Sequence, residues 1–451
     1  MKPAARGAPG AAAVSSAAAA SAAPSGRSPL ELFAIPMEYQ QLHDAYLLAR
    51  ANSRRSPDQV EFELHYEAYL LQMLDDINNR CYQPTAYTFV VLDPKPREIF
   101  ASDMGTRILH HYLHVRLIPL LEARLSKHTY NNRKGMGTSA CQAAVISDCY
   151  ELSQGYTREA YIIKIDLSGC FPSINQDIAY RQLEEVILSD YYGSDKDDLL
   201  YILRICIYSY PTLHCEFRGD VELRKFIKPD KSILNKPLGT GAAIGHLIWQ
   251  MAVTFYFNDI ILWLESLGIH VNVYVDDWYF VVINKIAFLT YTLPELRRRF
   301  ALIGATINER KFYCQSVHKG FECLGIHVKR DRAYPNTRVI KRAKRKAHDL
   351  DRCVKEDKIP RVLDSLNSYY GICKNTNGYN QALSIIGCLD PAWFNYIDFD
   401  SHRCCLVAKP EYSYRNRIIK KYNLYDPKRK RRVAPSNPRA TDRIVVYNGK
   451  V

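Results

Sequence analysis

Two adjacent carboxylates near the middle of the chain are the side chains best placed to do chemistry. Asp276 and Asp277 end the tetrapeptide Tyr274-Val275-Asp276-Asp277, which stands between Val271-Asn272-Val273 and Trp278-Tyr279-Phe280-Val281-Val282. The β-branched and aromatic runs on both sides predict a hairpin with the acids at its turn. Carboxylate oxygens at such a turn are hard ligands suited to Mg²⁺. Two such ions, about 3.5–4 Å apart, would hold the attacking and leaving oxygens of a phosphoryl transfer.

A third carboxylate stands at the end of another predicted strand. Asp166 directly follows the apolar run Tyr161-Ile-Ile-Lys-Ile165. Two such strands, adjacent in one sheet, would bring three carboxylates to one place. Neighbouring residues on a regular strand face opposite ways, so only a turn lets both Asp276 and Asp277 approach the same ions. We therefore expect Asp166 and Asp276 as direct metal ligands, with Asp277 ranked after them; an exposed acidic turn is the alternative for an isolated motif.

The elements that would position these acids predict an α+β fold. A buried strand at 161–165 and a hairpin at 271–282 would carry the acids, and further strands are expected near 87–92, 310–313 and 321–328. Helical periodicity covers 42–51, 60–78, 106–126, 139–154, 176–189, 197–209, 244–264 and 293–303, and it returns beyond Arg338. The polar, proline-containing stretch 210–237 is typical of an insertion or a long loop.

Length and charge indicate several subdomains and favour a polyanionic partner. A chain of 451 residues buries more than one core. Its net charge of +14 is concentrated in residues 402–451, where fourteen Lys and Arg stand against three Asp and Glu. This basic tail either binds RNA backbone, with its tyrosines stacking on bases, or is a solvated segment. At the other end, the Ala-, Ser-, Gly- and Pro-rich residues 1–36 are expected to form a disordered leader.

The thirteen cysteines show no repeated metal-binding spacing, and several lie in apolar contexts. This usage is typical of reduced, buried thiols, so we expect a cytoplasmic protein. We expect no membrane association, because even the apolar run 247–264 is interrupted by Gln250, Asn258 and Asp259.

With these residues assembled, the chain resembles a reverse transcriptase. Six blocks match the family's motifs in order, from about Pro94 to Gly371, and their order is far more specific than any one of them. The blocks are Arg133-Lys-Gly-Met-Gly137, Asp166–Phe171, Gly241–Gln250, Tyr274–Asp277, Asn308–Lys311 and Phe321-Glu-Cys-Leu-Gly325.

The resemblance implies a right-hand polymerase, with an antiparallel palm sheet carrying the catalytic acids. We expect fingers at 37–160, a palm at 161–330 with an inserted segment at about 210–237, a helical thumb at 331–401 and the basic tail at 402–451. It also implies two Mg²⁺ ions, with Mn²⁺ as an alternative, on Asp166, Leu167, Asp276 and Asp277.

Three matched positions suggest how the nucleotide would be bound. Arg133 resembles the fingers arginine that contacts the incoming triphosphate, a task suited to a bidentate guanidinium; a solvated loop cation is the alternative. Lys95 and Arg97 would add to the same basic face.

Two further positions would select the sugar and assist the leaving group. Phe171, five residues after Asp166, matches the family's steric gate, a ring that leaves no room for a 2′-hydroxyl; a core aromatic is the alternative. Lys311 matches the lysine near the pyrophosphate, where it would be a catalytic cation, although a lone lysine is normally just solvated. The block Phe321–Gly325 resembles the primer grip.

Bacterial and phage reverse transcriptases are favoured, in particular those of diversity-generating retroelements and their relatives. In the block Ile244-Gly-His-Leu-Ile-Trp-Gln250, Gly245 and Gln250 fit that group as residues bordering the template base and nucleotide, whereas Trp249 replaces a serine. The indole is expected to change pocket size or fidelity. Met104-Gly105-Thr106 is a second departure from the group's pattern.

The expected function is RNA-directed synthesis of cDNA from a structured template RNA and deoxynucleoside triphosphates, in a diversity-generating retroelement. That reading implies a small basic accessory protein as partner. The alternatives are a phage-defence reverse transcriptase with protein-primed or template-independent synthesis, and an RNA-binding scaffold that has lost turnover.

Overall fold

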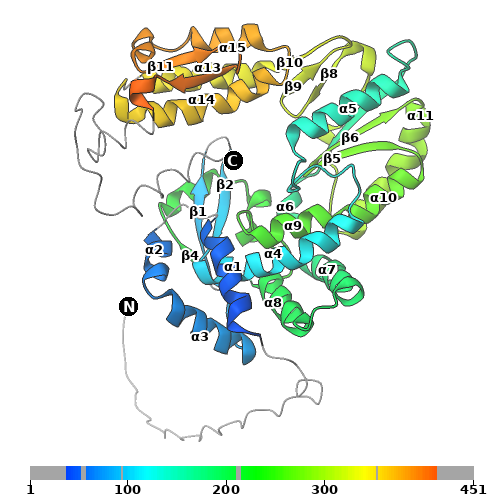
Figure 1. Cartoon of the computed structure of the whole chain (residues 1–451). Coiled ribbons are helices and arrows are strands. Elements are labelled where there is room, and N and C mark those ends of the chain that lie inside the picture. Colours follow the sequence, from blue (N-terminus) through cyan, green and yellow to red (C-terminus); the bar gives the residue numbers. More distant parts are fainter. Residues whose placement is uncertain (1–36, 52–56, 93–94, 210–214, 352–353, 414–451) are drawn as a thin grey trace, which may run out of the picture.

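In the computed structural model, residues 37–51, 57–92, 95–209, 215–351 and 354–413 are described. The predicted leader at 1–36 and most of the basic tail, 414–451, lie outside the described residues. Figure 1 shows three groups of elements: the N-terminal helices with β1, β2 and β4, a central sheet with its helices, and a C-terminal group around α14.

The N-terminal group combines helices with a small sheet. The expected helix over 60–78 is two helices that meet at His65. Asp103 starts the long helix α4, because its side chain accepts a hydrogen bond from the backbone N–H of Thr106. The elements are α1 (Tyr39–Ala51), α2 (Pro57–Leu64), α3 (Tyr66–Asn78), β1 (Ala86–Val91), β2 (Arg97–Ser102) and α4 (Met104–Arg124).

The segment expected as an insertion is tied into this small sheet. Its strand β4 (Cys215–Phe217) pairs in parallel with β1. Further along, the buried carboxylate of Glu98 accepts hydrogen bonds from the Ser232 hydroxyl and from the N–H of Ile233. The buried carboxylate of Glu98 therefore holds the segment 215–237 against β2. The polar composition of this segment did not indicate that contact.

The central sheet is antiparallel throughout and has the strand order β5-β6-β3-β7. Its strands are β3 (Tyr161–Asp166), β5 (His270–Tyr274), β6 (Asp277–Val282) and β7 (Tyr313–Ser316). The expected strand near 310–313 begins only at Tyr313, because Glu309–Lys311 forms a short 3₁₀ turn. The hairpin expected at 271–282 is present, with Val275 and Asp276 as its two-residue turn.

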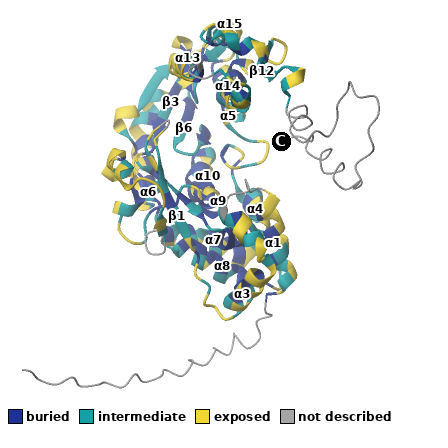
Figure 2. Ribbon diagram, turned by 90° about the vertical axis from the view of Figure 1, so that its left-hand side faces the viewer, coloured by how far each residue is buried: buried dark blue, intermediate teal, exposed yellow. Residues whose placement is uncertain are grey.

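Helices from several parts of the chain pack around this sheet. They are α5 (Thr138–Leu152), α6 (Cys170–Ser173), α7 (Gln176–Asp190), α8 (Lys196–Tyr208), α9 (Leu247–Tyr256), α10 (Asn258–Ser266), α11 (Lys285–Ala287) and α12 (Leu293–Leu302). Figure 2 shows buried residues running through α7, α8, α9 and β6 at the centre of the molecule.

The prediction of one continuous helix over 244–264 is wrong, because this range contains two helices. α9 ends at Tyr256 and α10 begins at Asn258, with Phe257 between them packed edge-on against Trp278. By length and composition alone, Leu247–Ser266 could cross a membrane, yet 72% of that stretch is buried inside the protein. Packing in the core accounts for its apolar character.

The C-terminal group has a hydrophobic core of its own around the fully buried Trp393. Its helices are α13 (Thr337–Asp351), α14 (Ile359–Lys374) and α15 (Tyr379–Ile386), and it is linked to the central sheet through the short strands β8 (Phe321–Cys323), β9 (Ile326–Val328) and β10 (Ala333–Pro335). The hairpin of β11 (Ile397–Asp400) and β12 (Cys405–Ala408) packs on α14. The expected boundary at 402 falls inside this hairpin, and Leu406 is part of the core.

Candidate active site

The three carboxylates predicted to bind metal ions meet at one end of the central sheet. β3 and β6 are neighbours, and their register places Asp166 directly opposite Asp277. Where β3 ends, the N–H of Leu167 donates to the backbone oxygen of Asp276 at 3.1 Å. The acids could meet only if their two strands were neighbours in one sheet. The strands are neighbours, and their pairing brings together residues more than a hundred positions apart.

The turn that presents Asp276 has an uncommon backbone. Val275 has φ +57°, in the left-handed region that a β-branched residue seldom adopts. This conformation costs about 1–2 kcal/mol for a residue with a Cβ. The turn lets Asp276 leave the alternation of the strand, so both adjacent acids reach the end of the sheet.

Two lysines are paired with the outer acids. Lys311 Nζ lies 2.7 Å from Asp166 Oδ1, and Lys164 Nζ lies 2.7 Å from Asp277 Oδ1. Asn308 adds a hydrogen bond from its amide to Asp166 Oδ2 at 3.3 Å. Burial, and next the negative charges of Asp277 and Asp166, raise the pKa of the Asp276 carboxyl above its usual range. Burial and the charges of the neighbouring acids therefore both disfavour the ionised form of Asp276.

These residues fit the divalent metal ions that the sequence predicts. Carboxylates are hard donors suited to Mg²⁺ or Mn²⁺, and the strand register brings Asp166, Asp276 and Asp277 to the same end of the sheet. The two ammonium groups at 2.7 Å show that Asp166 and Asp277 each hold a cation in direct contact. Leu167 is buried at the same place and would contribute through its backbone.

A cationic cluster borders the acids. Desolvation, and then the positive charges of Lys311, Lys231 and Arg97, lower the pKa of Lys95, while the charge of Asp166 acts in the opposite direction. Lys95 therefore shares an electrostatic environment with Arg97, Lys311 and Asp166. Lys231, from the segment tied to β2, contributes to the same environment. This arrangement suits a polyphosphate beside the metal ligands.

Comparison with known proteins identifies the family at this point. The family model described as "Reverse transcriptase (RNA-dependent DNA polymerase)" matches residues 94–328, just over half of the chain. The chain belongs to the reverse transcriptase family. No curated protein matches its sequence.

Solved telomerase structures show a distant likeness to this reverse transcriptase. The telomerase of Candida albicans, solved with the TWJ fragment of telomeric RNA, is 13% identical at a TM-score of 0.38, over 71% of this chain and 59% of the telomerase chain. The apo telomerase of Candida tropicalis is 12% identical at a TM-score of 0.38, over 77% of this chain and 71% of that one. The chain therefore spans about three fifths of the Candida albicans telomerase.

The predicted steric-gate residue lies beside the acids of the reverse transcriptase site. Phe171 is in α6, which starts four residues after Asp166. Its ring is half-buried and packs against the central core, and its carbonyl accepts the N–H of Ala242 at 2.8 Å. The residue therefore joins the loop after β3 to the block that contains Gly245, with part of its ring left accessible.

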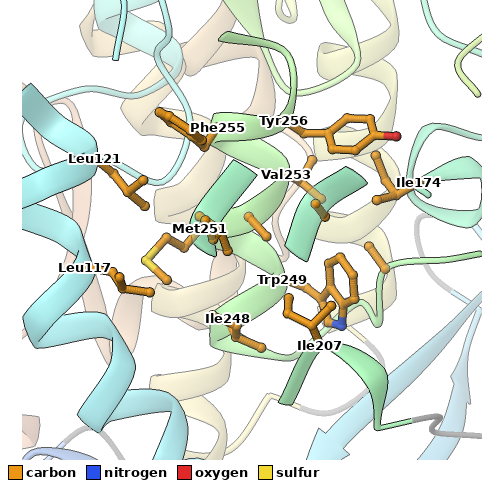
Figure 3. Close-up of a cluster of buried hydrophobic side chains, with 14 of the residues drawn as sticks. Leu117, Leu121, Ile174, Ile207, Ile248, Trp249, Met251, Val253, Phe255 and Tyr256 are labelled. Atoms are coloured by element: carbon orange, nitrogen blue, oxygen red, sulfur yellow. The ribbon is translucent and has the colours of Figure 1, made fainter. Parts of the chain in front are cut away.

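The block Gly241–Gln250 divides into surface and core positions. Gly245 and Gln250 are exposed, and Gly245 has φ +115° with a hypothetical Cβ overlapping the carbonyl oxygen of Phe100. Trp249 faces the other way. It is 1% exposed and lies among Ile207, Ile174 and other core side chains (Figure 3). The indole is enclosed by the core, so any effect on pocket size or fidelity would act through packing and stays a prediction.

Arg133 does not face the cationic cluster. Its guanidinium makes a bidentate pair with Glu122 and donates to the carbonyl oxygens of Ser126 and Thr129. The side chain is 9% exposed, so in this conformation its donors are used inside the protein. In this conformation Arg133 orders the loop that precedes α5, and its contact with the triphosphate stays a prediction.

No role was predicted for Lys164, Asn308 or Lys231 from the sequence. A signal existed for Lys164, because it precedes Asp166 by two residues on a strand and therefore shares its face. Its hydroxyl partner, Tyr279, also accepts the N–H of Leu324 from the predicted primer grip. Asn308 begins the matched block Asn308–Lys311, so that block was the signal for it. Lys231 lies in the segment expected as an insertion or a long loop, which indicated no role for it.

A second group of metal-capable side chains lies elsewhere among the described residues. Asp148, Glu151 and His270 have ligand atoms within 4.8 Å of one another. The buried Asp148 is already bonded to His270 at 3.0 Å and to the amide of Asn272 at 2.5 Å. These bonds satisfy its carboxylate, and we assign it a structural role in holding β5 to α5.

Proposed function

We propose that the protein is an RNA-directed DNA polymerase that makes cDNA from a structured template RNA and deoxynucleoside triphosphates. The observation that carries this proposal is the meeting of Asp166, Asp276 and Asp277 at the end of one sheet. An acidic turn alone would be ambiguous. Three carboxylates beside a cationic cluster match the two needs of nucleotidyl transfer, metal binding and neutralisation of a triphosphate.

Each residue has a role that follows from its position. Bound Mg²⁺ would lower the pKa of the primer 3′-hydroxyl and neutralise the phosphates. Lys311, whose side chain is 51% exposed, is placed to reach the leaving pyrophosphate. Lys95 and Arg97 bind the triphosphate oxygens. Phe171 lies under the sugar and excludes the 2′-hydroxyl.

The three groups of elements correspond to the parts of a right-hand polymerase. We assign residues 37–160 to the fingers, 161–330 to the palm and the group that starts at 331 to the thumb. The segment around 210–237 lies in the palm range by sequence, but its contacts with β1 and Glu98 join it to the fingers. The burial of Leu406 supports a thumb that includes the hairpin of β11 and β12.

The test is primer extension on an RNA template with Mg²⁺, comparing the wild type with Asp276→Ala. Asp177→Ala is the matched control, because Asp177 is an exposed aspartate on α7. We expect the control to extend the primer and Asp276→Ala to lose extension by several orders of magnitude. Equal synthesis by Asp276→Ala and the wild type would refute the assigned site. Full biological activity of an Asp166→Ala/Asp276→Ala double variant would favour an RNA-binding scaffold.

We further propose that the cDNA serves a diversity-generating retroelement, with a small basic accessory protein as partner and a cytoplasmic location. The two departures from that group now have a packing explanation. Trp249 fills the core, and Gly105 is buried at the start of α4 against the Tyr82 hydroxyl. Neither substitution touches the acids.

Sequencing the cDNA made in cells distinguishes the subgroups. Errors concentrated at template adenines would support diversity generation. A repeat or homopolymer product, or DNA covalently attached to the protein, would instead support phage defence with template-independent or protein-primed synthesis.

A further inference from the structure

The loop before Arg133 runs along the free side of β5, next to the turn that carries Asp276. Val273 in β5 donates its N–H to the carbonyl of His128 at 2.9 Å and accepts the N–H of Tyr130 at 3.0 Å. Thr129 and Val273 form a parallel bridge. The segment 128–131 therefore acts as a short additional strand beside the catalytic hairpin.

Buried polar groups anchor this segment. The Tyr130 hydroxyl donates to the amide oxygen of Asn272 at 3.0 Å, and Asn272 in turn donates to Asp148. Asn272 is fully buried in the middle of β5. Because buried groups of this kind are costly to leave without partners, the segment has one favoured position on the sheet.

The next residue, Asn131, contacts the turn itself. Its side-chain oxygen accepts the N–H of Val275 at 3.2 Å, and its amide donates to the Thr254 hydroxyl at 2.7 Å. The Thr254 hydroxyl is fixed by the carbonyl of Gln250 at 2.8 Å. Asn131 is 4% exposed. One buried amide thus links the hairpin turn to α9, which lies in a different part of the chain.

The residue that Asn131 holds is the strained one. Val275 has φ +57° and no glycine-like freedom. A disfavoured conformation persists only where surrounding contacts determine it. The N–H of Val275 precedes Asp276 by a single residue, so rotation at Val275 would carry the Asp276 carboxylate away from Asp166.

We propose that Asn131 is a positioning residue of the polymerase: its amide holds the Val275 turn in the left-handed conformation and so presents Asp276 for metal binding. This inference rests on the proposed function, because it concerns the same site. The Asn131 side chain bonds Val275 and Thr254. It acts through the backbone of the turn.

The experiment compares Asn131→Ala with Asn258→Ala in steady-state primer extension. Asn258 is a matched control because it is an equally buried asparagine, at the start of α10, that binds the other end of the same loop. It accepts the N–H of Ser126 at 2.9 Å and donates to the carbonyl of Arg124 at 3.0 Å, without contacting the turn. Both variants lose a buried bridging amide, so both lose thermal stability.

For Asn131→Ala alone we expect kcat to fall by about tenfold to a hundredfold, the range that a misplacement of about 1 Å produces. KM for the deoxynucleotide should stay within about twofold, because uniform binding is untouched. The Mg²⁺ concentration for half-maximal activity should rise. Asn258→Ala should keep its kcat per folded molecule. A wild-type kcat and Mg²⁺ requirement for folded Asn131→Ala would overturn the proposal.

Two further variants keep the test decisive. Thr254→Val removes the hydroxyl that holds the Asn131 amide while preserving side-chain shape, and it should move kcat in the same direction if Asn131→Ala does not fold. The double variant Asn131→Ala/Val275→Gly should lose less kcat than the losses of the two single variants combined, since glycine adopts the turn without strain. Additive losses would indicate a merely structural role.

Failure of this proposal is separable from failure of the proposed function. If Asp276→Ala is inactive while Asn131→Ala behaves as the wild type, only the positioning role is refuted. If Asp276→Ala remains active, the assigned site itself is wrong, and the effect of Asn131→Ala no longer bears on metal binding.

Discussion

At the scale of single residues, the three acids that the proposed function needs repel one another, and two of them are paired with lysines. Asp166 and Asp277 each have a lysine at 2.7 Å, whereas the pKa of Asp276 is raised by its burial and by the other two acids. An acid with a raised pKa weakens the folded state at pH values above that pKa, and the weakening disappears as the pH falls through it. Asp276 is therefore retained at a cost in stability.

The first prediction is that Asp276→Asn stabilises the metal-free protein at pH 7 while abolishing primer extension. Removing one half-buried charge from a like-charged group should raise Tm by about 2–4 °C, the shift that roughly 1 kcal/mol produces in a domain of 150–250 residues. Thermal melts in the presence of a chelator measure it. The difference between variant and wild type should shrink as the pH is lowered, because Asp276 then becomes protonated.

Asp349→Asn is the control for this melt, because Asp349 is an exposed aspartate on α13. It should leave Tm nearly unchanged. A Tm for Asp276→Asn equal to or below that of the wild type would show that the three acids do not destabilise the fold.

The second prediction concerns Phe171, whose partly accessible ring follows Asp166. Phe171→Val should lower the preference for deoxynucleotides over ribonucleotides, measured as a ratio of kcat/KM values, by about tenfold or more. Phe399→Val, a half-buried ring in the distant hairpin of β11 and β12, should leave that ratio unchanged. An unchanged ratio for Phe171→Val would mean that its ring serves only the core.

At the scale of elements, local patterns predicted the parts that carry the acids. The apolar run before Asp166 and the hairpin around Asp276 are both present, because short continuous runs of β-branched and aromatic residues predict strands buried on both faces. Patterns did not reveal the break at Phe257 or the burial of Trp249, since an apolar helix packed on every side shows no periodic face. Nor did patterns reveal the partners of Arg133, Glu122 and two carbonyls, because tertiary structure sets them.

The third prediction belongs to the contact between β2 and the start of α9. Gly245 has φ +115°, and a Cβ there would overlap the carbonyl oxygen of Phe100, which cannot move without disturbing β2. Gly245→Ala should therefore destabilise the protein by about 2 kcal/mol or more. Denaturant unfolding with Gly245→Ala measures the decrease.

Gly371→Ala supplies the contrast. Gly371 lies inside α14 with open space where its Cβ would stand. Alanine there should raise the free energy of unfolding by about 0.5–1 kcal/mol, because glycine is the weaker helix former. If the two substitutions changed stability alike, the close approach at Gly245 would not exist in solution.

At the scale of the whole molecule, the C-terminal group is a second folded unit with its own core. Composition placed the start of the basic tail at 402, because charge changes there. Burial places Cys404 and Leu406 inside the unit instead. Composition averages over a window and does not detect two short strands whose alternate residues reach a core formed by distant helices.

The fourth prediction separates these two parts of the C-terminal region. Removing residues 414–451, which carry twelve Lys and Arg against two Asp and Glu, should leave the cooperative melt intact. It should also reduce the salt dependence of RNA binding, by about 0.7 in the slope of log K against log salt for each phosphate that the tail neutralises. Fluorescence anisotropy over a salt series measures this slope, and an unchanged slope would mean that the tail does not bind RNA.

A longer deletion provides the comparison for stability. Ending the chain at Tyr396 removes the hairpin, including the buried side chains of Ile397 and Leu406, each of which contributes about 1.5–3 kcal/mol. The C-terminal unit should then lose its cooperative melt. A melt as sharp as that of the full chain would show that the hairpin is dispensable.

The pairing of Lys311 with Asp166 and of Lys164 with Asp277 has a practical consequence. The chain supplies its own counterions, so folding and metal loading are separate events. Protein purified in the presence of a chelator should stay native through storage. Restoring Mg²⁺ should then return activity without a refolding lag, in contrast to proteins whose structural zinc creates the fold.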